Sequence, residues 1–128
     1  MKNSTYLIAE IIRIMKTMRV NPVSEEYDLQ REIAMELKKN SIEFVPEYKL
    51  GKRSRVDFMI SGSGIVIEVK KGKPYTQKVI EQLNRYAAFP DVEAIILVVE
   101  TSLMHLPDVI HGKSVYCIGL NKLWGIAL

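Results

Sequence analysis

The sequence has very little cysteine and no long apolar run, and both shortages narrow the classes of protein to consider. Cys117 is the single cysteine among 128 residues, so no disulfide can form within the chain and a reducing compartment is favoured. No apolar run approaches the roughly 20 residues that cross a bilayer, and no secretory signal pattern is recognised. Repeats and low-complexity tracts are also absent. We therefore expect a cytoplasmic protein without a membrane partner.

The chain also has little net charge. The chain has 18 Lys and Arg against 15 Asp and Glu, a net charge of +3. With 48% hydrophobic and 26% charged residues, we expect one domain, residues 1–128, with a substantial core. The basic residues gather on either side of residues 56–69. They are Lys49, Lys52, Arg53 and Arg55 before it and Lys70, Lys71, Lys73 and Lys78 after it. Such a cationic rim suits nucleic acid, although charge runs alone favour a solvated lysine-rich surface.

Residues 55–70, RVDFMISGSGIVIEVK, predict two strands joined by a tight turn at residues 61–64. If the turn takes these four residues or only the central pair, Ile60 lies opposite Ile65. Counting back along both strands then places Asp57 opposite Glu68. Directly paired residues have Cβ atoms about 4.5–5.5 Å apart. Two carboxylates at that distance repel each other unless something positive lies between them.

The paired carboxylates predict a metal site. Mg²⁺ commonly takes one or two carboxylates together with waters. Lys70 follows Glu68 by two residues and therefore projects from the same face of the strand. A salt-bridge cluster on a solvated sheet face is the simpler alternative.

Apolar patterns predict the remaining elements. Helices are expected over residues 5–18, 25–39 and 77–89, and further strands over residues 41–50, 94–99 and 115–120. We expect Ser24 and Thr76 to be N-caps, a short helix near residues 107–110, and Trp124 to cover the core. The apolar stripe of the first helix is wide, which suggests that part of it packs on a second subunit.

The helix expected over residues 25–39 carries a carboxylate on its apolar face. Leu29, Ile33 and Leu37 form the stripe, and Glu26 lies seven residues before Ile33 on the same stripe. A carboxylate aimed inward needs a reason. The hypothesis is that the first turn of this helix ends beside the metal pair, with Glu32 as the second choice. Surface glutamates that complement the helix dipole are the alternative.

The order helix–strand–hairpin–helix–strand, with Asp57 and then Glu68-Val69-Lys70, resembles the PD-(D/E)XK nuclease superfamily. The resemblance covers about residues 24–100. It implies an α/β, restriction-endonuclease-like core in which a mixed sheet of about 4–5 strands is flanked by helices in the order αβββαβ. Residues 1–20 would add an N-terminal helix. The sequence departs from the name-giving pattern in having Val56 before Asp57, which removes no ligand.

The resemblance also implies roles for individual residues. Asp57 and Glu68 would bind Mg²⁺, for which Mn²⁺ would substitute, and the Val69 carbonyl would be a third ligand. Lys70 would orient or activate the attacking water, and Glu26 would be the acidic residue of the first core helix. Gln82 and Tyr86 match the Q-x-x-x-Y element of the RecB-type and Cas4-like branches, and are expected to contact phosphate or to stack on a base. The nucleic-acid-binding set is Gln82, Tyr86, Lys52, Arg53, Arg55, Lys71 and Lys73.

These roles predict a metal-dependent deoxyribonuclease. By analogy with the Holliday-junction resolvases of the same superfamily, we expect an endonuclease for structured or branched DNA that works as a homodimer. One alternative is a RecB-like or Cas4-like nuclease on single strands or ends. The other alternative is a non-catalytic nucleic-acid-binding module of a larger complex.

Overall fold

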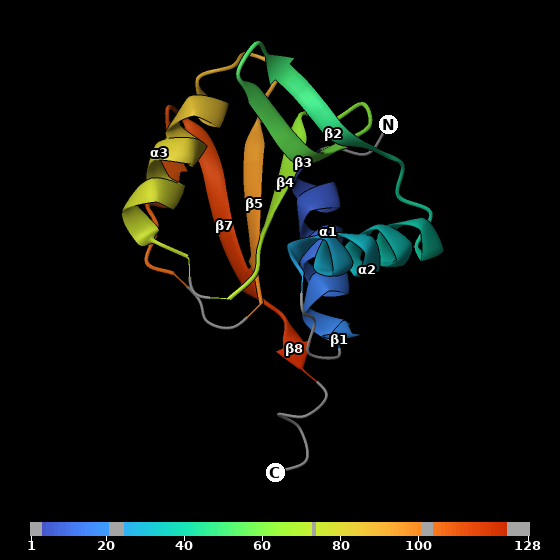
Figure 1. Cartoon of the computed structure of the whole chain (residues 1–128). Coiled ribbons are helices and arrows are strands. Elements are labelled where there is room, and N and C mark those ends of the chain that lie inside the picture. Colours follow the sequence, from blue (N-terminus) through green and yellow to red (C-terminus); the bar gives the residue numbers. More distant parts are fainter. Residues whose placement is uncertain (1–3, 21–24, 73, 101–103, 123–128) are drawn as a thin grey trace.

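The computed structural model of the chain describes residues 4–20, 25–72, 74–100 and 104–122. Helices cover both faces of a central sheet (Figure 1), so the architecture is a three-layer α/β sandwich. The helices are α1 (Ser4–Thr17), α2 (Glu26–Lys39) and α3 (Thr76–Ala87). The strands are β1 (Arg19–Val20), β2 (Phe44–Gly51), β3 (Ser54–Ile60), β4 (Ile65–Lys70), β5 (Ala94–Val99), β6 (Val109–Ile110), β7 (Lys113–Gly119) and β8 (Asn121–Lys122). Within the described ranges, none of the helices has the length and hydropathy needed to cross a membrane.

The central sheet is mixed. Its six strands follow the order β2-β3-β4-β5-β7-β6, with β4, β5 and β7 parallel and the outer pairs antiparallel. A separate parallel pair joins β1 to β8. Strand β2 is an edge strand, as Pro46 predicts, because proline cannot donate to a second neighbour.

The sheet separates two apolar cores. All residues of β5 are buried, as the continuous run AIILVV predicts, and they alternate between the cores. The residues facing α1 and α2 are Ala94, Ile96 and Val98, and those facing α3 are Ile95, Leu97 and Val99. On α2, the expected stripe of Leu29, Ile33 and Leu37 is buried. Figure 1 shows α1 and α2 on one side of the sheet and α3 on the other.

The wide stripe of α1 is used within the chain. Ile8, Ile11, Ile14 and Met15 are buried in the same core as α2, and Leu7 and Ile12 pack against it. The width of the stripe is therefore explained without a second subunit.

The α/β class and the element order α2–β2–β3–β4–α3–β5 agree with the prediction, but the expectation of about 4–5 strands was too low. The helix expected near residues 107–110 is wrong, because Val109–Ile110 is strand β6. His111 and Gly112 both have positive φ, at 51° and 76°, which is the geometry of a two-residue hairpin turn into β7. Such a turn favours antiparallel pairing over a helix.

Two smaller predictions concern the N-caps and the C-terminus. The prediction that Thr76 is an N-cap is wrong, because Tyr75 holds that position and Thr76 is the first residue of α3. Glu25 holds the N-cap position of α2. Ser24 and Trp124 lie outside the described residues.

The β3–β4 turn depends on two glycines with positive φ, Gly62 at 72° and Gly64 at 79°. A Cβ on Gly64 would lie 2.9 Å from the backbone oxygen of Asp91, whereas one on Gly62 would meet nothing within 4 Å. We expect Gly64→Ala to lower the free energy of unfolding by about 2–4 kcal/mol, and Gly62→Ala, the matched control, by about 1–2 kcal/mol. Urea unfolding measures both, and equal losses would contradict the argument from close contact.

Candidate active site

The β3–β4 hairpin has the predicted register. Phe58 pairs with Ile67 and Met59 with Val66, so Asp57 and Glu68 occupy the next facing positions. Here side-chain carboxylates, in place of backbone carbonyl oxygens, accept hydrogen bonds from backbone N–H groups. The backbone N–H of Asp57 donates to Oε1 of Glu68 at 3.2 Å, and the N–H of Val69 donates to Oδ2 of Asp57 at 2.8 Å. Each carboxylate is therefore fixed by the strand opposite its own.

Asp57 also stands at a break in the pleat of β3. Val56 packs in the core under α3, whereas Phe58 packs in the core under α1 and α2. In a regular strand these two residues would share a face. On the neighbouring strand, Glu47 falls between the pairs Pro46–Phe58 and Tyr48–Val56 and has φ 54°. This left-handed residue interrupts the β2–β3 ladder next to Asp57.

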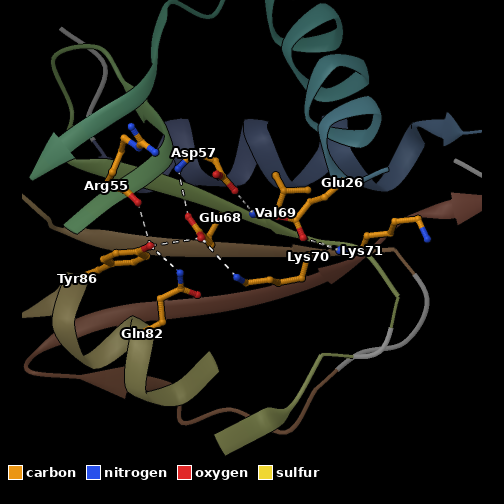
Figure 2. Close-up of polar contacts among 9 residues, drawn as sticks. All are labelled: Glu26, Arg55, Asp57, Glu68, Val69, Lys70, Lys71, Gln82 and Tyr86. Carbon is orange, nitrogen blue, oxygen red and sulfur yellow. Dashed lines mark hydrogen bonds and ion pairs between the residues drawn. The ribbon is translucent and has the colours of Figure 1, made fainter. Parts of the chain in front are cut away.

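Glu68 is the centre of the polar contacts. Figure 2 shows its carboxylate between the backbone of Asp57 and the side chains of Lys70 and Tyr86. Glu68 is 4% exposed, and Lys70 Nζ lies 3.7 Å from its Oε2. The expectation that Lys70 shares the face of Glu68 is confirmed.

Tyr86 and Gln82 hold this carboxylate from α3. The Tyr86 hydroxyl lies 3.3 Å from Oε2 of Glu68 and 3.0 Å from the carbonyl oxygen of Arg55, and Gln82 Nε2 donates to it at 2.8 Å (Figure 2). A tyrosine hydroxyl has one hydrogen, so it donates to one of the two acceptors at a time. Both α3 residues thus act on the site through Glu68.

The prediction that Tyr86 stacks on a base is corrected by its burial. The side chain is 3% exposed and belongs to the core under α3 together with Val79, Leu83 and Ala87. The ring of Tyr86 points into this core, where no face is open to a base. Gln82 is half-buried.

Burial dominates the electrostatics of the carboxylate pair. It raises the pKa of Glu68 to about 8, and repulsion from Asp57 adds to the shift. Burial also raises the pKa of Asp57 to about 6, while the hydrogen bond from Val69 opposes this. Burial and the charge of Glu68 raise the pKa of the Tyr86 hydroxyl. Negative charge on these carboxylates is therefore destabilising, and a cation placed between them would reduce that cost.

The donor chemistry of the pair fits a hard cation. Two carboxylates with waters are a common ligand set for Mg²⁺. Among the described residues, no group of three or more His, Cys, Asp or Glu side chains is arranged to hold a metal ion. Any ion at Asp57 and Glu68 must therefore draw further ligands from backbone oxygens, such as the Val69 carbonyl, or from water and substrate.

Two acidic side chains fix the loop that follows Lys70. Glu26, at the start of α2, accepts the backbone N–H of Lys71 at 3.3 Å, and its charge contributes to the raised pKa of Asp57. Glu100, 5% exposed after the end of β5, accepts the N–H of Gly72 at 3.2 Å. Glu26 therefore lies at the site as the hypothesis required, whereas Glu32 is exposed on α2.

The basic residues expected to bind nucleic acid differ in their exposure and in the elements that carry them. Lys52 and Arg53 are exposed in the turn between β2 and β3. Arg55 is exposed and lies 3.4 Å from Oε1 of Glu47. Lys71 is half-buried beside Glu26. Lys73 lies outside the described residues.

Glu100 and the backbone conformation of Glu47 were not singled out from the sequence. Glu100 could have been found, because polar residues just after a buried parallel strand gather at the carboxyl edge of the sheet. Glu47 carries no such signal, since its backbone conformation is a non-local result.

Comparison with protein-family models, with curated proteins and with solved structures finds no match to this chain. The assignment of a function therefore depends on the geometry of the site and on the motif resemblance.

The raised pKa values predict how pH affects the metal-free protein. The folded state holds the Glu68 proton more tightly than the unfolded state, in which the carboxyl has its usual pKa of 4.5. The stabilising contribution of this proton is therefore present at low pH and is lost as the pH rises through about 8. We expect Glu68→Gln to be more stable than the wild type at pH 8 by roughly 1–3 kcal/mol, with the difference vanishing near pH 4. Urea unfolding in a chelator measures this difference, and a gap that grows towards low pH would contradict it.

The contact between the Tyr86 hydroxyl and Glu68 predicts how Tyr86 affects metal binding. Removing the hydroxyl in Tyr86→Phe leaves Glu68 without its partner on α3, so we expect Mn²⁺ affinity to fall by about 10-fold. Titration calorimetry measures this affinity. Tyr75→Phe is the matched control, because Tyr75 is 77% exposed, and an equal loss in both variants would refute the role of the Tyr86 hydroxyl.

Proposed function

We propose that this protein is a metal-dependent deoxyribonuclease with the restriction-endonuclease-like fold of the PD-(D/E)XK superfamily. The observation that carries the proposal is the pair of half-buried Asp57 and buried Glu68, in which each carboxylate accepts an N–H of the opposite strand beside Lys70. Holding two carboxylates together away from water costs stability. A module that only binds nucleic acid gains nothing from this cost, whereas a metal-dependent enzyme does.

The roles follow from the contacts. Asp57 and Glu68 would hold a Mg²⁺ ion, or Mn²⁺ in its place, with the Val69 carbonyl as a further ligand. When bound, the ion would polarise the scissile phosphate and lower the pKa of a water. Lys70, held 3.7 Å from Glu68, would orient the attacking water and stabilise charge that develops on the phosphate. Glu26 would keep the loop after Lys70 in place through Lys71.

The substrate is proposed to be DNA. The exposed Lys52 and Arg53 lie on the turn that leads into β3, and the exposed Arg55 lies near the start of β3, where they would contact phosphates. Structured or branched DNA is the expected substrate, and single strands or ends are the alternative. A homodimer, which would offer two sites to two strands, remains part of the proposal.

The test is cleavage of a panel of single strand, duplex, flap and four-way junction in Mg²⁺ or Mn²⁺. We expect the wild type to cut at least one substrate, and Glu68→Ala to cut none. Lys70→Ala should keep DNA binding and lose about 100-fold or more in rate. Glu43→Ala is the matched control, because Glu43 is an exposed glutamate just before β2.

A second matched pair tests α2. Glu26→Ala should slow cleavage, whereas Glu32→Ala, on the exposed face of the same helix, should not. No metal-dependent cutting of any substrate by the wild type, with binding unchanged in Glu68→Ala, would contradict the nuclease and leave a binding module.

A further inference from the structure

A cavity of about 190 Å³ lies between α2 and the β2–β3 pair. Its walls include Tyr27, Gln30 and Arg31 of α2, together with Glu47, Asp57 and Phe58 of the two strands. Asp57 therefore belongs both to this cavity and to the carboxylate pair. Whatever enters the cavity comes next to the proposed position of the scissile phosphate.

The α2 wall of the cavity presents planar groups. The Arg31 guanidinium carbon lies 5.9 Å from the centre of the Tyr27 ring, and Arg31 Nη2 lies 3.8 Å from Oδ1 of Asp28, which helps to hold its orientation. Tyr27 is 67% exposed, the kind of exposure that leaves an aromatic ring available for contact. Aromatic rings and guanidinium planes are the groups on which proteins stack unpaired bases.

The size and charge of the cavity restrict its occupant. Pockets that enclose a drug-sized ligand measure about 300–1,000 Å³, so this cavity suits a single planar ring system. The carboxylates of Glu47 and Asp57 disfavour a phosphate group on the strand side of the cavity, and the one cation on its wall, Arg31, already faces the carboxylate of Asp28. A neutral base is small enough for the cavity and carries no negative charge, and the phosphate to which it is attached would remain outside, next to Asp57.

The strand side of the cavity is built by the irregular backbone. Glu47, with φ 54°, interrupts the ladder next to Asp57. A non-glycine residue in this conformation costs about 1–2 kcal/mol and is over-represented at binding and catalytic sites.

We propose that this cavity receives one unpaired base of the substrate strand, next to the phosphodiester held at Asp57 and Glu68. The inference rests on the proposed nuclease function and narrows its substrate. In continuous duplex the base would first have to leave the helical stack, at a cost in free energy. The substrate class is therefore DNA with an unpaired nucleotide at the cleaved bond, as in a single strand, a flap or an open branch.

Binding is tested in the Glu68→Gln background, which is expected not to cut. Short single strands carry one 2-aminopurine, whose fluorescence is quenched by stacking. We expect Tyr27→Ala to weaken single-strand binding by about 10-fold, the size of effect that base stacking supplies, and to abolish the quench at one position. Duplex binding should change by less than twofold.

The control is Tyr6→Ala, at a half-exposed tyrosine of α1 outside the cavity, which should change neither single-strand binding nor the quench. Equal binding and quenching with and without Tyr27 would overturn the proposal.

Cleavage gives an independent test from the substrate side. An abasic nucleotide is moved through a single-stranded substrate, and kcat/KM is measured for the wild type and for Tyr27→Ala. We expect one abasic position beside the cut to cost the wild type about 10-fold and to cost Tyr27→Ala nothing further, because both changes remove the same contact. Cleavage by the wild type that is insensitive to every abasic position would overturn base capture while leaving the nuclease intact. Absence of all cleavage would refute the nuclease, and the fluorescence experiment would still decide whether a base is bound.

Discussion

The site depends on the reciprocal hydrogen bonds between the facing strands β3 and β4. Asp57 accepts the N–H of Val69, and Glu68 accepts the N–H of Asp57. These bonds satisfy backbone donors that the ladder would otherwise pair, so the hairpin can place two acidic side chains between its strands without leaving buried N–H groups unpaired. The break in the pleat at Asp57 and the left-handed Glu47 accompany this arrangement.

The surrounding elements hold this pair from three sides. Helix α3 brings Tyr86 to Glu68 from one face of the sheet, and α2 brings Glu26 towards Asp57 and Lys71 from the other. Glu100 joins the loop after Lys70 to the end of β5. Because Glu68 is buried and Asp57 is half-buried, their charge is poorly solvated, which explains both their raised pKa values and the suitability of the pair for a divalent cation.

The proposed chemistry and the proposed base-binding cavity share Asp57. On one side of it, Glu68 and Lys70 form a group suited to a cation and a phosphate. On the other side, Tyr27 and Arg31 form a wall suited to a planar ring. A nucleotide has both parts, a phosphate and a base, joined through one sugar. The two neighbouring environments thus match the two chemical halves of one nucleotide.

The sequence alone determined what depends on local periodicity. Counting outward from the glycine-rich turn gives the β3–β4 register, hence the facing of Asp57 and Glu68, and the stripe of α2 places Glu26 towards the sheet. Only the tertiary structure decided the sixth strand β6, the inward position of Tyr86, the conformation of Glu47 and the cavity beside Asp57. Apart from β6, which pairs with the adjacent β7 across a two-residue turn, these features arise from contacts between different elements, and the packing of those elements selects among side-chain and backbone states that local pattern leaves open.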